Sequence, residues 1–222
     1  MKKLKILAVL LLLCGAASAQ SAKDIAKERH EIAKLSKSEL NAKATKAARK
    51  ASKDAKKDGW IVAPGALPLE KQFDRAYGMQ YEYDENAFPK YMMGEAMSIG
   101  ENYDAAKMQA LELAKQNLAG QIQTEVTALI ENTVANKQLA AEQAASITET
   151  VMASKNLISQ RIGRVIPVVE CYRDKKNKNK EVRLMIAYNS KMAMEAAKET
   201  VREQLEQKGQ NLHEQLDTVL GF

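Results

Sequence analysis

The sequence contains few of the residues that mark disulfide-rich, collagen-like or multispanning membrane proteins. Its 222 residues include 2 Cys, 2 His, 1 Trp and 4 Pro, and aromatic residues make up only 5%. No apolar run reaches the roughly 20 residues that a membrane-spanning helix needs. The 10 glycines are too few for a linker-like chain. The core must therefore consist mainly of aliphatic, alanine and methionine side chains.

Residues 1–19 have the pattern of an export signal. Three early lysines precede the apolar run 6–13, and small residues at 17–19 precede Gln20. We expect cleavage after Ala19, export into the periplasm or to the periplasmic face of the outer membrane, and a mature chain without a transmembrane helix. The alternative is lipidation at Cys14, but the bulky Leu13 stands where a small residue is expected.

The remaining cysteine and the histidines do not form a catalytic pattern. After cleavage Cys171 would be the only cysteine, so no intramolecular disulfide can form, and a structural thiol is favoured over a redox or intermolecular-disulfide role. His30 and His213 fall in polar segments that favour helices. No glycine-rich nucleotide motif is present. We therefore expect a protein that is not an enzyme and has no cofactor.

Positive charge is concentrated in one segment. Residues 20–58 contain 12 Lys and Arg against 6 Asp and Glu, whereas residues 59–222 carry a small net negative charge. The segment 21–58 is rich in Ala, Lys and Glu and lacks Pro and Gly. It predicts one long helix, either continuous or broken, that ends before Gly59. Its apolar residues are few and small, which predicts weak packing on the rest of the protein.

The basic segment has two interpretations. It is either a solvated helix face or a contact with anionic envelope material such as phospholipid or lipopolysaccharide head groups. Nucleic acid is not expected as a partner because an exported chain is separated from it. The candidate residues for the anionic surface are Lys43, Lys46, Arg49, Lys50, Lys53, Lys56 and Lys57.

The rest of the chain predicts alternating helices and strands. After a connector at 59–88 that includes a helix near 69–83, we expect a strand at 91–98 in which Gly94 marks a bulge or a close backbone approach. A helix capped by Asn102 extends to about residue 130, and a second helix covers 139–157. Residues 162–172 and 181–188 predict a β-hairpin, followed by a final helix at 191–208 and a short amphipathic end at 212–220.

These elements predict an α+β fold with four segments along the chain. A small three-stranded antiparallel sheet would be packed by a long alanine-rich helix and a C-terminal helix, and a basic N-terminal helix would precede them. The segments are a signal peptide at 1–19, a basic helical extension at 20–58, a connector at 59–88 and an α+β domain at 89–222.

Two stretches carry a resemblance to a known family. They are the proline-led strand from Pro89 to Ile99 and the alanine-rich helix with its Asn117-Leu118-Ala119 segment. Residues 88–200 resemble the LPP-twenty lipoprotein family and the related N-terminal domain of a flagellar outer-ring assembly protein. The resemblance implies a small α/β cell-envelope domain used for association, with a protein partner or self-association and no catalytic residues.

Methionine offers an alternative chemistry. Thioethers are soft ligands that select Cu(I), and several methionines flank predicted strand and helix starts. The candidates are Met92, Met93, Met97, Met192 and Met194. Flexible methionines also fill gaps in a core, which is the favoured interpretation. We expect an exported, non-enzymatic envelope protein with an assembly or interaction role, with copper handling or anionic-surface binding as alternatives.

Overall fold

The computed structural model describes residues 24–31, 33–35, 37–38, 41–136, 138–210 and 212–220. The predicted signal and Cys14 lie outside the described residues. The chain divides into two compact units, residues 1–43 and residues 44–222. Within the described ranges, no helix has the length and apolar character needed to cross a membrane.

The predicted basic helix is divided between the two units. In the first unit, the described residues from 24 to 38 are helical, and so is Asn41. Residues 42–45 are not helical, and helix α2 (Lys46–Lys57) begins after them in the second unit. The basic segment is therefore broken, and the boundary between the two compact units falls within it, after residue 43.

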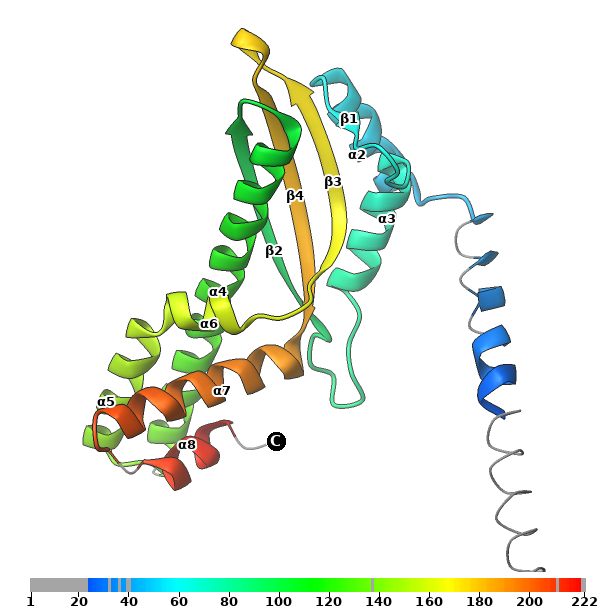
Figure 1. The fold of residues 1–222 in the computed structure, drawn as a ribbon. Helices are drawn as coiled ribbons and strands as arrows, with labels where there is room; N and C mark the ends of the chain where they lie inside the picture. Colours follow the sequence, from blue (N-terminus) through cyan, green and yellow to red (C-terminus); the bar gives the residue numbers. More distant parts are fainter. Residues whose placement is uncertain are drawn as a thin grey trace, which may run out of the picture. The chain divides into compact units, whose positions relative to one another are not determined.

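The second unit contains the β-sheet and is shown in Figure 1. After α2, its elements in chain order are β1 (Ile61–Val62), α3 (Leu69–Gln80), β2 (Tyr91–Gly100), α4 (Tyr103–Ala135), α5 (Ala141–Ala153), α6 (Lys155–Arg161), β3 (Ile166–Asp174), a 3₁₀ turn η1 (Lys176–Lys178), β4 (Lys180–Asn189), α7 (Ser190–Gln207) and α8 (His213–Leu220). The α+β prediction is confirmed. The predicted helix at 139–157 is two helices, α5 and α6, that meet at Ser154.

The sheet is antiparallel with the strand order β1-β3-β4-β2. It has four strands where three were predicted, because Ile61 and Val62 pair with Tyr172 and Cys171 of β3. The predicted hairpin is β3 and β4, and the register shifts between Pro167 and Val169, where proline cannot donate to the ladder.

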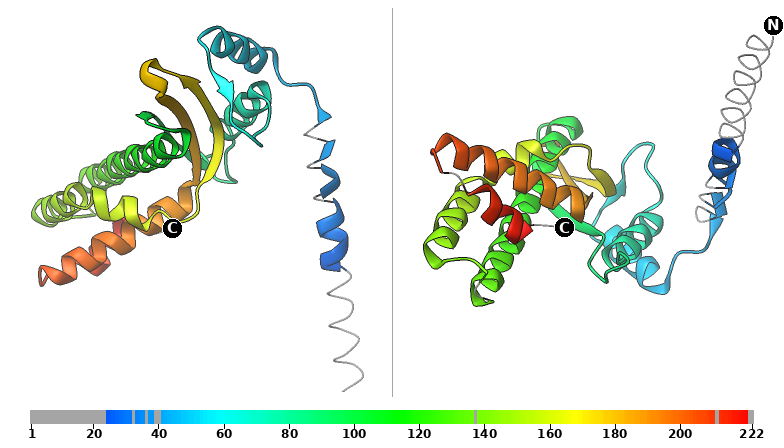
Figure 2. Two further views of the ribbon diagram at one scale, coloured as in Figure 1. Left: turned by 45° about the horizontal axis from the view of Figure 1, so that its top comes forward. Right: turned by 90° about the horizontal axis from the view of Figure 1, so that it is seen from below.

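Helix α4 covers one face of the sheet (Figure 2). The Asn102 side chain accepts the first-turn Ala105 N–H at 2.9 Å, which confirms the predicted cap. Alanines at 106, 110 and 114 are fully buried and face the sheet, so the helix lies close to the strands. At Gly94 an added Cβ would lie 2.5 Å from the Ala114 carbonyl oxygen, so the predicted close backbone approach is confirmed.

The opposite face is covered by α3, with α2 packed on α3. Leu69, Phe73 and Ala76 of α3 are buried with Trp60 and Val169 in a second apolar cluster. The sheet therefore has two covered faces, and the basic segment contributes to one of them.

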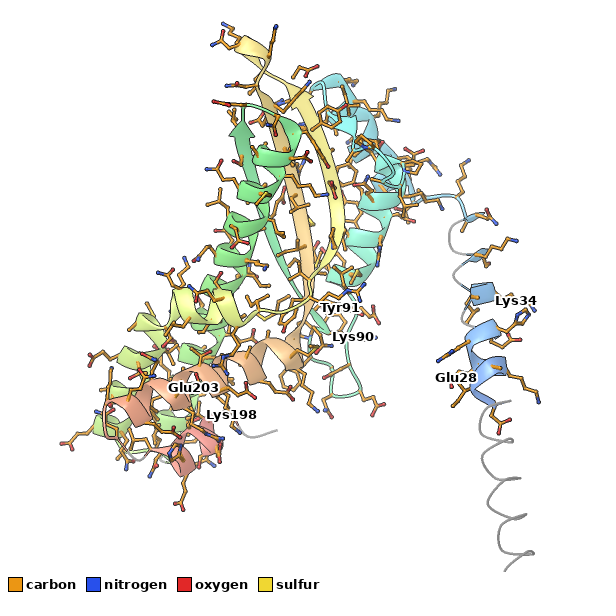
Figure 3. All side chains as sticks on the ribbon, in the orientation of Figure 1. Glu28, Lys34, Lys90, Tyr91, Lys198 and Glu203 are labelled. Atoms are coloured by element: carbon orange, nitrogen blue, oxygen red, sulfur yellow. The ribbon has the colours of Figure 1, made fainter. Side chains whose placement is uncertain are left out.

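Helices α5 to α8 extend the core beyond the sheet. Arg161 of α6 binds Glu199 at 2.9 Å and also pairs with Glu203, while Lys198 binds Asp217 of α8 at 2.9 Å. Lys198 and Glu203 lie along α7 (Figure 3). The Ser190 N–H donates to the Lys90 carbonyl at 3.0 Å, which joins the start of α7 to the start of β2. The ion pairs join α6, α7 and α8 to one another, and the Ser190–Lys90 hydrogen bond connects α7 to the sheet.

Candidate anionic-surface site on α2

Helix α2 has small residues on one side and lysines on the other. The Thr45 side chain accepts the Ala48 N–H at 3.3 Å, and Gly59 adopts a φ of 84° just after the helix, as expected for these helix-end positions. The residues that α2 buries are Ala48, Ser52 and Ala55. Their small size lets the helix backbone approach α3, so the stripe that predicted weak packing forms a docking face.

Polar contacts hold α2 on α3. The Thr45 N–H donates to Asp74 Oδ1 at 2.9 Å, and this bond lowers the pKa of the Asp74 carboxyl. Ser52 Oγ donates to Glu70 Oε2 at 3.2 Å, and Lys56 Nζ lies 3.7 Å from the same oxygen. The start and the middle of α2 are thus both fixed to α3.

Four lysines form a line on the solvent side of α2. Lys46, Lys50, Lys53 and Lys57 are spaced at i, i+4, i+7 and i+11, which places them roughly opposite the buried Ala48. The line spans about 16 Å at 1.5 Å per residue. Lys57 lies 3.5 Å from Asp54, whereas Lys46, Lys50 and Lys53 have no ion-pair partner among the described residues. We call these four residues the lysine line.

The other three predicted residues are placed differently. Arg49 donates to the Ala44 carbonyl at 2.6 Å, and Lys56 pairs with Glu70. Lys43 belongs to the first compact unit. The structure therefore brings together four of the seven predicted residues in one line.

The β3–β4 hairpin adds lysines that the predicted site did not include. Residues 175–180 contain four lysines, and those at positions 176 and 178 are exposed at the tip. Arg173 Nη1 donates to the Asp58 carbonyl at 3.1 Å, and its guanidinium lies 4.5 Å from the centre of the Trp60 ring. The hairpin tip thus lies at the end of the body where α2 ends (Figure 1). In the sequence, the lysines of residues 175–180 were the feature that could have indicated this second basic element.

The structure divides the methionines proposed as copper ligands. Met92 of β2 and Met194 of α7 belong to the large apolar core that includes α4, and Met93 packs against the second apolar cluster on the opposite face of the sheet. Met97 and Met192 are exposed. Neighbouring residues of a strand point to opposite faces, so Met92 and Met93 cannot serve one metal ion. In the described part of the chain, no three His, Cys, Asp or Glu side chains are grouped to bind a metal ion.

Cys171 is a buried free thiol in β3. Burial is the main cause that raises its pKa to about 11. The reactive species is the thiolate, so we expect iodoacetamide to modify Cys171 at pH 8 at least a hundredfold more slowly in the native protein than in urea. Mass spectrometry of the labelled Cys171 peptide measures the two rates. Equal rates would show that the β1–β3 edge opens faster than the thiol reacts.

The histidines occupy separate places. His213 of α8 lies 3.4 Å from Glu206, and His30 belongs to the first unit. No family model matches the sequence, and no curated protein or solved structure was found that is similar to it.

Proposed function

We propose that this protein is an exported, non-enzymatic envelope protein whose interaction role includes binding anionic lipid head groups through the lysine line of α2. The observation that carries the proposal is the row of Lys46, Lys50, Lys53 and Lys57 on a helix docked by its opposite side. The signal-like residues 1–19 and the resemblance to envelope-associated domains support the location.

The arrangement suits a flat anionic surface. Three of the four ammonium groups have no internal carboxylate partner among the described residues, so binding does not require an existing ion pair to break. Each lysine near an anionic membrane contributes on the order of 1 kcal/mol, and the interaction decays over a Debye length of about 8 Å at physiological salt. Because α2 is fixed to α3, its lysines are presented together without the cost of ordering a free helix.

The test is vesicle binding by Lys50→Gln with Lys53→Gln. Removing two of the four charges is expected to weaken binding to phosphatidylglycerol–phosphatidylcholine vesicles about 30-fold, which corresponds to about 2 kcal/mol. Co-sedimentation at 50 and 200 mM NaCl measures the affinity and its salt dependence. The variant should also show a smaller loss of binding between the two salt concentrations.

A matched control separates the lysine line from net charge. Lys155 and Lys191 are exposed lysines of α6 and α7. Lys155→Gln with Lys191→Gln removes the same charge and is expected to bind within a factor of three of the parent protein. Equal losses in the two double variants would contradict a localised site, and unchanged binding in both would contradict the proposed function.

A further inference from the structure

β2 is an edge strand whose outer side is protected over half of its length. The Gln121 side-chain amide donates to the Met93 carbonyl at 2.9 Å, and the Asn117 amide donates to the Glu95 carbonyl at 2.8 Å. Edge strands need such protection because their unpaired backbone groups can pair with another chain. Two side chains of α4 thus cap the first half of this edge.

The second half of the edge has no such caps. Outward backbone groups alternate along a strand, so Met97 and Ile99 present theirs on the same side as Glu95. One turn before Asn117, the α4 residue is Leu113, whose side chain cannot donate a hydrogen bond. Among the described residues, β2 pairs only with β4, and nothing caps the outward N–H and C=O groups of Met97 and Ile99.

Apolar side chains border this open segment. The side chains of Met97 and Ile99 are 54% and 50% exposed on the sheet face opposite α4, and Leu113 of α4 is 42% exposed. The free N–H and C=O groups of this segment can pair with an extended strand of a partner. The exposed apolar side chains beside them favour a partner strand that also carries apolar side chains. The second half of β2 itself has this chemistry.

We propose that Met97–Gly100 pairs in antiparallel orientation with the same segment of a second copy of this chain. The pairing would continue the four-stranded sheet of each copy across a twofold axis at Ser98. This inference concerns self-association and is independent of the lysine line on α2.

The register follows from where the amide caps end. With the axis at Ser98, Met97 of one copy lies opposite Ile99 of the other, and each pair exchanges backbone hydrogen bonds in both directions. An axis at Met97 would instead place Ile99 against Glu95, which is paired with Arg183. Only the register at Ser98 pairs the two uncapped residues, Met97 and Ile99, with each other, so that apolar side chains lie side by side at both positions.

The helices accommodate the pairing. α4 lies over β2 and β4, so the α4 helices of two copies would lie on the same face of the joined sheet. Paired strands are about 4.8 Å apart, so two α4 helices that each lie between β2 and β4 would have axes about 10 Å apart, close to the 8–10 Å of packed helices. Leu113 would then be buried between them.

The first experiment measures mass by sedimentation equilibrium over a range of concentrations. The purified protein should approach the dimer mass as concentration rises. Met97→Lys with Ile99→Lys places like charges across the joint and should weaken dimerisation about a hundredfold. The control Met108→Lys with Met152→Lys alters exposed methionines on α4 and α5 and should leave dimerisation unchanged. Thermal melts of both double variants establish that they are folded.

The second experiment tests the register. Residues opposite each other in a hydrogen-bonded pair have Cα atoms about 5.5 Å apart, within disulfide range. An oxidised mixture of Met97→Cys and Ile99→Cys proteins should form the mixed disulfide dimer at least fivefold more than either variant alone. A monomer at all concentrations, or a dimer that Met97→Lys with Ile99→Lys leaves intact, overturns the proposal, and preferential disulfide formation by one variant alone overturns the register.

Discussion

Replacement of Gly94 by alanine is expected to lower the free energy of unfolding by about 3 kcal/mol. The new Cβ would lie 2.5 Å from the Ala114 carbonyl oxygen and 3.2 Å from Leu118 Cβ. The first contact is with helix backbone, so relief requires α4 to move away from the sheet. That movement would loosen the packing of the buried alanines along the helix. Urea denaturation followed by circular dichroism measures the change.

Gly78 provides the matched control. It lies within α3, and an added Cβ there would meet no atom within 4 Å. Gly78→Ala is therefore expected to stabilise the protein by about 0.5–1 kcal/mol through helix propensity alone. The two Gly-to-Ala changes should have opposite signs. If Gly94→Ala unfolded at the same urea concentration as the parent protein, the contact between β2 and α4 would accommodate a Cβ atom at residue 94, which would contradict this prediction.

This close approach was predictable from the sequence because its signals are local. A glycine within a strand and alanines at helical spacing both indicate that backbones meet, and Asn102 before a periodic apolar pattern indicates the helix start. β1 lacked such a signal. Two residues form a strand only because β3 offers them an edge, and that partner lies more than a hundred residues away in the sequence.

The candidate site on α2 could be predicted from the sequence only in part, for a related reason. Charge composition identified the seven basic candidates, and helical periodicity could have separated the four of the lysine line. The docking of α2 was missed because Ala48 and Ala55 offer little apolar area. Small residues hold two helices together because they let the backbones approach closely, and not because they bury a large apolar surface. Whether α2 can approach so closely depends on the shape of α3. Only the folded structure shows that the lysines of the hairpin tip lie at the end of the body where α2 ends.

The docking of α2 reverses the expectation for a deletion. If α2 packed as weakly as its small apolar residues suggest, a chain beginning at Gly59 would fold normally. In the structure that deletion exposes the buried side of α3 and removes the hydrogen bonds to Asp74 and Glu70. We expect it to lose about 5 kcal/mol of stability, which is comparable to the whole stability of many domains, and to melt over a broad range. Differential scanning calorimetry measures the transition.

A chain beginning at Ala44 is the comparison that isolates α2. It retains Thr45, the buried stripe and the lysine line, and it begins where the second compact unit begins. We expect the removal of residues 1–43 to change the free energy of unfolding by less than about 1 kcal/mol. Since 1 kcal/mol shifts the melting temperature of a domain of this size by about 2–4 °C, the shorter chain should melt within about 2 °C of the longer protein. It should also bind phosphatidylglycerol vesicles through the lysine line. A chain from Gly59 that melted as sharply as the chain from Ala44 would show that α2 rests on the surface of α3 without stabilising it.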